Sequence, residues 1–581
     1  MRRLWMLLAV LSVTGSYGVS QVAITAKPAF FKDWGLTPSG VYGRIALTNV
    51  SKRAYNKIWK PDPFTIKIQE YDAAGVLYQT QVFRLNRGAV SQMSLTNQWG
   101  NTYEIGHYAS AGTGQLLVSG LRSGTNTMLP AKYSRYIYKL NLLVEVNYLS
   151  ADKELMNNSA GVATVRYKRA SDPVCFGSIV EMSFFNSAGE PVVSTSWDAH
   201  KVVYTYDRRC NAISRAFYGN DDEPLTNRNG GFMDKFTYNE IDSEVLDQIV
   251  GLNGELVRNA YGIAQARSDY TDGFRTRVTR MDLDGHPARM TKTGDGVAII
   301  HYRFDDKGNN TQISYCDEAD KPINSTAGFQ TIKYAWSPNR MLLRTEYFDP
   351  TGAPVENNSG IHRYDYVRDD KGRVIQTSYF DKANQPVEDD LHQVFAVKYK
   401  YDDAGRNYSE SFWKDADTKM TRWDGSHEIV TVFDEDGRGI ERSTFDQDGK
   451  LYVTKAGWSR VTTTYNALGQ VAEHRYFNDK TPITLGESMV TAFHILRYTY
   501  DGAGRVSTVT YYSATGAPVN AGIDLGDKHY EDQKLEYIYK GNTLVEQRFY
   551  KAGNVSPEMI LDCVKHDHVS TSGISLAYKR Q

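Results

Sequence analysis

The chain has 581 residues, of which 67 are basic and 68 are acidic, so its formal net charge is -1. A chain of this length exceeds one ordinary hydrophobic core, which predicts several domains or a repeat array. The balanced charge argues against a nucleic-acid partner, which would require a clustered basic excess, and offers no polybasic segment for anionic lipid.

Residues 1–20 have the pattern of a secretory signal peptide. Arg2 and Arg3 supply a positive start, residues 4–13 form an apolar run, and small residues precede a plausible cleavage site before Gln21. The run is shorter than the roughly 20 residues that span a bilayer, and the sequence shows no second apolar run of spanning length. We therefore expect an exported protein without a membrane span, either periplasmic, cell-surface or secreted, with an uncleaved anchor as the alternative.

Residues 21–145 form a first region with no internal repeat. Strand-like runs at 40–50, 64–71, 76–85 and 136–148 are separated by turns rich in Gly, Asn and Pro. Short strands at this density predict an Ig-like β-sandwich.

Residues 146–556 form a repeat array with a period near 32 residues, which predicts stacked supersecondary units. Tyr347 and Tyr379, for example, begin successive Tyr-Phe-Asp units 32 positions apart. We call the aromatic position before the first turn of each unit the marker residue; it is occupied by Tyr206, Tyr238, Tyr270, Phe304, Trp336, Arg368, Tyr401, Phe433, Tyr465, Tyr500 and Tyr539. A second series keeps the same cadence: Pro191, Pro224, Pro287, Pro322, Pro354, Pro386, Pro482 and Pro518.

The chemistry of one unit predicts two or three short strands. Residues 396–401 alternate in the period-2 manner of a strand, and residues 402–405 form an Asp-to-Gly turn signal. Residues 349–352 give a second turn signal, and Pro354 cannot donate to a central ladder position. Such units cannot bury their own faces, so we expect a solenoid-like array, with a β-propeller or a closed β-shell as alternatives. Residues 244–250 favour a short helical turn.

The segments 401–406 and 500–505, which read Tyr-Asp-x-x-Gly-Arg, resemble the YD repeats of the RHS family. Weaker versions occur at 206–207 and 304–308, and the unit is longer than the usual YD repeat because of a Gly-x-Pro-Val insertion. The resemblance implies an exported, surface-associated β-scaffold whose repeats supply no catalytic residues. The tail 557–581 is too short for the effector domain that ends RHS toxins, so we expect it to cap the array.

Cysteine and acidic motifs give few site signals. Cys175 and Cys210 lie about one repeat apart in sequence and are a possible disulfide. The Asp-x-Asp-Gly segments at 282–285, 434–437 and 446–449 lack the further oxygen ligands of a calcium loop and are better explained as turns. Cys563, with two histidines shortly after it, has no partner half for a zinc site. We therefore expect no metal and no cofactor.

Repeated aromatic residues are the remaining candidates for binding: Trp336, Tyr347, Tyr379, Trp413 and Tyr476. Rings on a strand surface can stack on sugars or contact a protein, although cross-strand packing is the simpler explanation for each one. The leading hypothesis is an exported, non-enzymatic scaffold that engages a protein or glycan. A glycan-acting hydrolase built on a β-propeller is the alternative.

Overall fold

The structure is a computed structural model that describes residues 28–562 with internal gaps. The gaps lie at 38–39, 47–49, 87–88, 101, 113, 120–132, 151, 159, 173–174, 292–293, 468, 484–492, 502–504, 526–527, 541–542 and 558. Over the described residues every regular element is a β-strand, which confirms the all-β prediction. The predicted signal peptide and most of the tail after residue 562 lie outside the described residues.

The chain divides into two compact units. The first holds residues 1–399, apart from 157–161 and 194–196, which group with residues 400–581 in the second. The first unit therefore contains the N-terminal region and the first repeats, and the second contains the later repeats.

The N-terminal region is a meander of consecutive strands. Its strands are β1 (Ala29–Thr37), β2 (Gly40–Ala46), β3 (Tyr55–Asp62), β4 (Thr65–Tyr71), β5 (Leu77–Asn86), β6 (Ala89–Asn97), β7 (Thr102–Gly112), β8 (Gln115–Ser119), β9 (Tyr133–Lys139) and β10 (Leu142–Leu149). Strand β1 pairs with both β2 and β3, and from β3 onward each strand pairs antiparallel with the next. Strand β10 then pairs with β11, so the ladder continues into the array. This differs from the expected Ig-like sandwich, which has Greek-key connections between two sheets.

The repeats contribute one hairpin each. In the first unit these strands are β11 (Thr164–Arg169), β12 (Ile179–Phe185), β13 (Lys201–Tyr206), β14 (Ala212–Tyr218), β15 (Met233–Tyr238), β16 (Glu244–Val250), β17 (Gln265–Thr271), β18 (Phe274–Met281), β19 (Ile299–Phe304), β20 (Asn310–Cys316), β21 (Thr331–Trp336), β22 (Leu342–Phe348), β23 (Arg363–Arg368) and β24 (Val374–Phe380). The division between the two units falls within the next strand, β25 (Ala396–Tyr401). In the second unit the strands are β26 (Asn407–Trp413), β27 (Glu428–Phe433), β28 (Gly439–Phe445), β29 (Arg460–Tyr465), β30 (Val471–Asn478), β31 (Thr481–Pro482), β32 (Ile495–Tyr500), β33 (Val506–Tyr512), β34 (Ala521–Leu525), β35 (Lys528–Asp532), β36 (Lys534–Lys540), β37 (Thr543–Tyr550) and β38 (Met559–Asp562).

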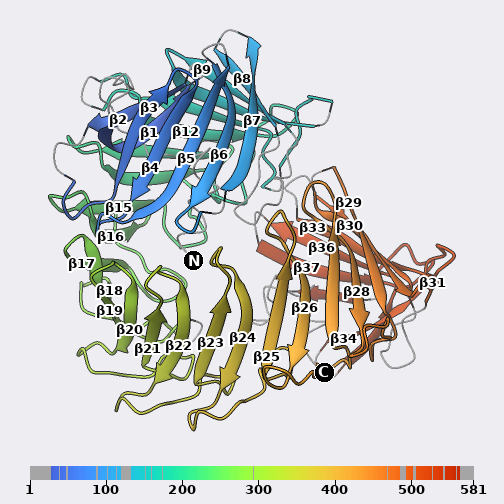
Figure 1. Ribbon diagram of the computed structural model, residues 1–581. Coiled ribbons are helices and arrows are strands. Elements are labelled where there is room, and N and C mark those ends of the chain that lie inside the picture. Colours follow the sequence, from blue (N-terminus) through green and yellow to red (C-terminus); the bar gives the residue numbers. More distant parts are fainter. Residues whose placement is uncertain are drawn as a thin grey trace. The chain divides into compact units, whose positions relative to one another are not determined.

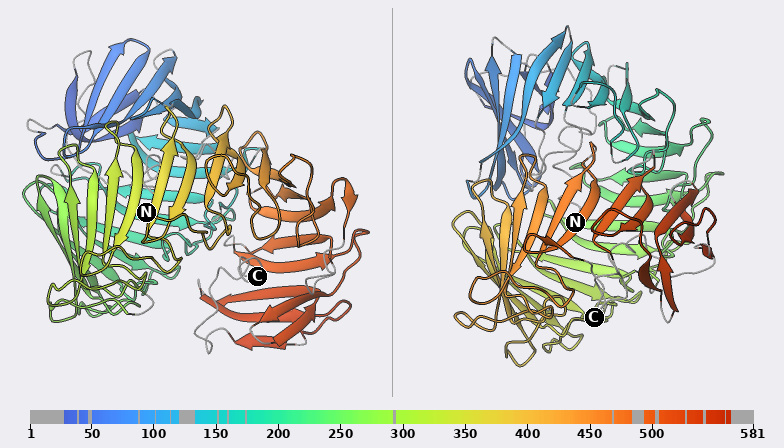
Figure 2. Two further views of the ribbon diagram at one scale, coloured as in Figure 1. Left: turned by 60° about the horizontal axis from the view of Figure 1, so that its bottom comes forward. Right: turned by 90° about the vertical axis from the view of Figure 1, so that its right-hand side faces the viewer.

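Neighbouring hairpins join edge to edge, so strands such as β17 to β24 lie side by side in chain order (Figures 1 and 2). The solenoid-like array is therefore confirmed. The propeller alternative is wrong, because a propeller requires separate four-stranded blades and here the ladder passes from each hairpin to the next. The helical turn expected at 244–250 is also wrong: this segment is strand β16, paired on both sides.

Three turns of the same chemistry shape each repeat. In the turn after β22, the Asp349 carboxylate accepts hydrogen bonds from the backbone N–H groups of Thr351 (2.8 Å) and Ala353 (2.9 Å). The fourth position, Gly352, has φ +84°, which a residue without Cβ adopts at no steric cost. Asn357 and Asp369 organise the other two turns in the same way. These contacts explain the Asp-to-Gly cadence of the sequence as hairpin closure.

The proline series marks a short return of the chain on each hairpin. Pro354 forms an isolated bridge with Phe348, and the next residue, Val355, donates its N–H to the Tyr347 carbonyl at 3.1 Å. Six other prolines of the series occupy the equivalent bridge: Pro191, Pro224, Pro287, Pro322, Pro386 and Pro518. A residue without an N–H is tolerated here because the bridge ends after one pair.

Loops of the N-terminal meander dock on the first turns of successive repeats within the first unit. Arg340 pairs with Asp72 (Nη2–Oδ2, 3.1 Å), and Lys52 pairs with Asp272 (Nζ–Oδ1, 2.5 Å). The indole N–H of Trp99 donates to a backbone carbonyl of the β21–β22 turn at 3.1 Å. The same indole covers Gly372, where an added Cβ would lie 2.6 Å from Trp99 Cδ2. We call the loop residues Lys52, Asp72 and Trp99 the N-terminal clamp.

The last repeats of the second unit carry additions to the hairpin pattern. Strands β34 and β35 form a separate two-stranded sheet inserted before β36. Strand β38 pairs with β37 and is the last strand of the ladder that the structure describes.

Candidate functional site

The marker residues act as hydrogen-bond donors between neighbouring repeats. In seven of them the side chain donates to a backbone carbonyl at the start of the second strand of the preceding hairpin. These bonds run from Tyr206 to Ile179 (2.6 Å), Tyr238 to Ala212 (3.0 Å), Tyr270 to Glu244 (2.9 Å), Trp336 to Asn310 (2.7 Å), Arg368 to Leu342 (2.6 Å), Tyr465 to Gly439 (2.7 Å) and Tyr500 to Val471 (2.8 Å). We call these the cross-repeat hydrogen bonds.

The acceptor carbonyls belong to residues at the start of the second strand, beside an irregularity in the hairpin. In the β15–β16 hairpin the register shifts between Thr237 and Tyr238, so that Tyr238 pairs with Glu244. A bulge interrupts the ladder and leaves a backbone group for another partner. Glu244 is the residue whose carbonyl accepts from Tyr270 of the next repeat. Trp336 and Arg368 depart from the Tyr or Phe pattern but still donate a hydrogen bond, as the tyrosines at this position do.

Two marker residues lack a polar tip and pack instead. Phe304 stacks on Phe274 with ring centroids 4.8 Å apart. Phe433 lies beneath the guanidinium of Arg406, 4.9 Å from the ring centroid.

One face of the repeat sheet carries tyrosines at a fixed strand position. Tyr302, Tyr334 and Tyr366 each lie two residues before a marker residue, on consecutive repeats, and all three are half-buried. Burial, with smaller contributions from the neighbouring tyrosines Tyr366 and Tyr302, raises the pKa of Tyr334 to about 12. With two strands per repeat, adjacent members lie about 9.6 Å apart along the sheet. We call these three residues the tyrosine row.

The opposite face is charged. Arg344 pairs with Asp365 (Nε–Oδ1, 2.7 Å) of the next hairpin, and Arg363 approaches the same carboxylate (Nε–Oδ2, 3.4 Å). On the same strand Val367 is 48% exposed, which shows that this face meets solvent. The alternation of a strand thus separates the tyrosine row from a solvated, ion-paired face.

The five aromatic residues singled out in the sequence have packing roles in the structure. Trp336 makes a cross-repeat hydrogen bond, and Trp413 donates to Ser411 at 2.9 Å. Tyr347 contacts the ring of Phe329 at 4.4 Å. Tyr379 and Tyr476 are buried, with 6% and 5% of their surface exposed. The sequence patterns considered above did not predict the tyrosine row, although a tyrosine two positions before the marker residue recurs in three successive repeats.

The acidic segments considered as calcium loops form ordinary turns. Asp282 accepts the backbone N–H groups of Asp284 and His286, at 3.0 and 2.9 Å. Asp434 accepts both the backbone N–H and the Nε of Arg438, each at 2.8 Å. Their carboxylates are thus engaged in closing hairpins.

Cys175 and Cys210 form a disulfide with a Cα–Cα distance of 5.5 Å. Cys210 occupies the fourth position of a first turn, with φ +60°. The bond therefore joins the turn of the β13–β14 hairpin to the loop between β11 and β12.

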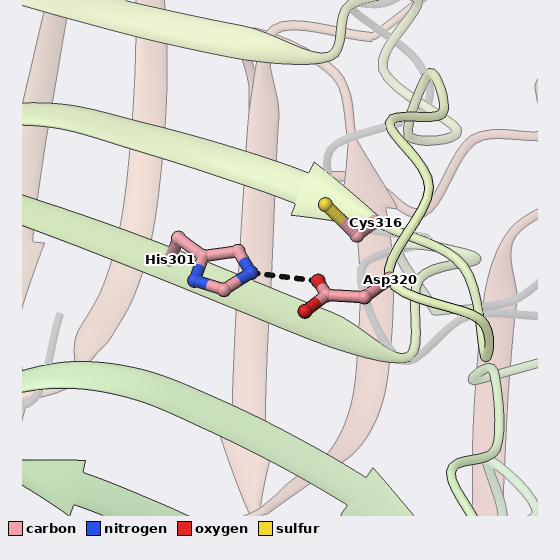
Figure 3. A group of neighbouring side chains, drawn as sticks. All are labelled: His301, Cys316 and Asp320. Carbon is pink, nitrogen blue, oxygen red and sulfur yellow. Dashed lines mark hydrogen bonds and ion pairs between the residues drawn. The ribbon is translucent and has the colours of Figure 1, made fainter.

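The clearest cluster of metal-ligating groups in the described part of the chain combines His301 on β19, Cys316 at the end of β20 and Asp320 in the following turn (Figure 3). One ligand atom from each lies within 4.8 Å of the others. The imidazole Nε2 of His301 lies 2.7 Å from Asp320 Oδ1, and Arg277 Nη2 lies 3.1 Å from Asp320 Oδ2. We call the first three residues the His-Cys-Asp cluster.

The thiol in this cluster is chemically quiet. Burial, together with the negative charge of Asp320, raises the pKa of Cys316 to about 11. The hydrogen bond from His301 lowers the pKa of the Asp320 carboxyl, with Arg277 contributing. A nucleophilic cysteine requires a lowered pKa and an adjacent base. Here the thiol faces a carboxylate instead, so the geometry does not favour covalent catalysis.

A second group of ligand types, Asp282, Asp284 and His286, lies in the turn after β18. It contains no thiol, and the His286 side chain is 78% exposed. Within the described residues, no helix has the length and apolar character needed to cross a membrane.

Comparisons with known proteins identify no family. No family model matches the chain, and no curated protein matches it. The crystal structure of TcdB2-TccC3 aligns over 85% of this chain and 27% of its own, at 10% identity and a TM-score of 0.36. The Photorhabdus luminescens Tc holotoxin pore aligns over 86% and 30%, at 10% identity and a TM-score of 0.21.

A porin-like protein from Bacteroides uniformis aligns over 61% of this chain and 89% of its own, at 9% identity and a TM-score of 0.12. The chain thus spans about 27% of the length of the first of these structures. Similarity at these TM-scores carries no argument about function.

Proposed function

We propose that the protein is an exported, non-enzymatic repeat scaffold whose tyrosine row binds a glycan. The observation that carries this proposal is that different repeated residues have different roles in the structure. The marker residues and turn acids hold the hairpins together. Tyr302, Tyr334 and Tyr366 recur at a strand position that neither the turns nor the marker-residue hydrogen bonds use, although Tyr366 is itself hydrogen-bonded to Thr345 of the preceding hairpin.

The chemistry of the row suits a polymeric ligand. A tyrosine offers an apolar ring and a polar hydroxyl, which together match the apolar face and hydroxyl groups of a sugar. Half-buried rings lose little conformational freedom on binding, because the sheet already holds them. The three rings follow one another along the sheet at intervals of about 9.6 Å, and the sugar units of a polysaccharide likewise follow one another at regular intervals.

Export is the second part of the proposal. The N-terminal 20 residues support it by their charge, apolar run and small residues before Gln21. The Cys175–Cys210 disulfide also suits an oxidising compartment.

The test of binding is a glycan array probed with the full chain and with a triple variant, Tyr302→Leu, Tyr334→Leu and Tyr366→Leu. Leucine keeps apolar bulk but removes the ring and hydroxyl, so binding should fall by at least about tenfold, which corresponds to 1.4 kcal/mol. The matched control is Val367→Ser, which changes the opposite face beside Tyr366 and should bind as the parent does. Equal binding by the triple variant, or retention of a protein partner alone, would contradict the glycan proposal.

Export is tested separately by fractionating the native host and sequencing the N-terminus of the recovered protein. A mature chain that begins near Gln21 and lies outside the cytoplasm is expected. Intact Met1 on cytoplasmic protein would refute export while leaving the binding result unaffected.

A further inference from the structure

We propose that the His-Cys-Asp cluster binds a divalent transition-metal ion of the zinc type through His301 Nε2, Cys316 Sγ and Asp320 Oδ1. Imidazole, thiolate and carboxylate are the three ligand types that zinc sites use, and the sulfur ligand disfavours calcium and magnesium.

The cluster arises where one repeat departs from its neighbours. The position of Cys316 forms the isolated bridge to the repeat proline, and Phe348 and Phe380 fill that position in the next two repeats. Replacing a phenylalanine by cysteine removes a ring and places sulfur in the vacated space. Cys316 is only 4% exposed, so the sulfur points into the protein beside the other two groups.

The equivalent turn of another repeat shows what the cluster adds. Asp222, like Asp320, lies at the fourth turn position with positive φ, and it pairs with Lys201 at 2.6 Å. That arrangement is an ordinary exposed ion pair with no metal-ligating partner. In the His-Cys-Asp cluster Asp320 keeps a cationic partner, Arg277, and also contacts an imidazole, which offers a lone pair in its neutral form.

The distances suit a shared ion. Zinc lies about 2.0–2.3 Å from nitrogen, oxygen and sulfur ligands, so ligand atoms around one ion are separated by about 3–4 Å. The three atoms lie within 4.8 Å of one another, and His301 Nε2 and Asp320 Oδ1 must move apart from 2.7 Å. Side-chain rotation can supply this adjustment, because the His301 and Asp320 side chains are 37% and 38% exposed. The same exposure leaves a fourth position for water.

Arg277 has a defined part in this site. Its guanidinium lies against Oδ2 of Asp320, which leaves Oδ1 directed at His301. A hydrogen-bonded partner of this kind orients a carboxylate ligand. Its positive charge also weakens attraction for a cation, so the affinity should be lower than that of a site without it. Binding replaces the thiol proton by the metal ion, and one proton is released to solvent.

The test uses the full chain in a Cys563→Ser background, so that Cys316 is the one thiol outside the disulfide. Metal-free protein is titrated with Co²⁺, and absorption is followed for the thiolate-to-cobalt charge-transfer band. We expect saturation at one equivalent and displacement of the band by Zn²⁺. Release of one proton per ion, measured in weak buffer, is a second readout.

The ligand variants are Cys316→Ser, His301→Gln and Asp320→Asn, and the control is His286→Gln in the neighbouring thiol-free group. Cys316→Ser should abolish the band, and the other two should weaken binding by at least about tenfold. His286→Gln should titrate as the parent does. The His301 side chain reaches solvent, so its variant tests the site without disturbing the interior.

Absence of a charge-transfer band at stoichiometric Co²⁺ would overturn the proposal. So would a titration that His301→Gln and Asp320→Asn both leave unchanged, because the thiol alone would then account for the signal.

Discussion

The cross-repeat hydrogen bonds can be tested by removing one donor atom. Tyr465→Phe keeps the ring and deletes only the hydroxyl that lies 2.7 Å from the Gly439 carbonyl. A hydrogen bond of this kind contributes about 1 kcal/mol net, and a buried carbonyl left alone costs more. Both residues are half-buried, so water can reach the carbonyl and the cost should stay near about 1 kcal/mol.

The reverse substitution, Phe433→Tyr, should add a cross-repeat hydrogen bond and stabilise the array by about the free energy that Tyr465→Phe removes. Phe433 is a marker residue without a donor, and the position equivalent to Gly439 in the preceding hairpin is Asn407 at the start of β26. Phe433→Tyr should place a hydroxyl at the Asn407 carbonyl. The Arg406 guanidinium packs on the ring face, so it need not be displaced by a group at the ring's far end.

Native-state hydrogen exchange is the appropriate assay, because repeat arrays open locally. A change of about 1 kcal/mol alters the opening equilibrium about fivefold. Amides of β28 and β29 should therefore exchange about fivefold faster in Tyr465→Phe, and those of β26 and β27 about fivefold slower in Phe433→Tyr. If exchange in both variants equals that of the parent, the cross-repeat hydrogen bonds do not stabilise the array and the reasoning fails.

Three further predictions test other parts of the fold. Burial raises the pKa of Tyr238, with smaller contributions from neighbouring carboxylates. The stability that the protonated Tyr238 contributes is therefore complete below about pH 10, the pKa of an unfolded tyrosine, and is lost as the pH rises further. In Tyr238→Phe the urea midpoint of unfolding should therefore fall less steeply at alkaline pH. Asp234 is 5% exposed and pairs with Arg215, whose side chain is 36% exposed; Asp234→Ala should cost about 3 kcal/mol, the lower end of the range for a broken buried pair, and a cost under about 1 kcal/mol in thermal unfolding would refute burial of the pair. Gly372→Ala and Gly352→Ala both place a Cβ at positive φ, but only the first meets the clamp indole, so a greater loss of protection from proteolysis in the N-terminal loops is expected for Gly372→Ala alone.

Strands and turns could be predicted from the sequence where the residues of a single hairpin determine them. The strand at 396–401 was predicted with the bounds that the structure shows, and the turn acid Asp402 caps its turn as expected. Residues 244–250 were misjudged as helical because their apolar spacing is ambiguous over so short a run, and pairing with two neighbouring strands decides their conformation.

Contacts between different repeats could not be predicted from the sequence. Trp336 and Arg368 look like exceptions to the Tyr or Phe pattern, and only the carbonyls beside them show that they replace the hydrogen-bond donor of a tyrosine. The disulfide partners were anticipated from spacing, but the His-Cys-Asp cluster was not, because it depends on which side chains of two paired strands and a turn face one another.

The N-terminal clamp sets an order of events during synthesis. Each strand of the ladder finds its partner in the adjacent stretch of chain, but Asp72 lies 268 residues before Arg340. At about 5–20 residues per second, this interval lasts about 15–50 s. Throughout that time the loop that carries Trp99 has no repeat turn to cover its indole. A growing chain therefore exposes this ring until the seventh hairpin or so has emerged, and a chain truncated before Arg340 would expose it permanently.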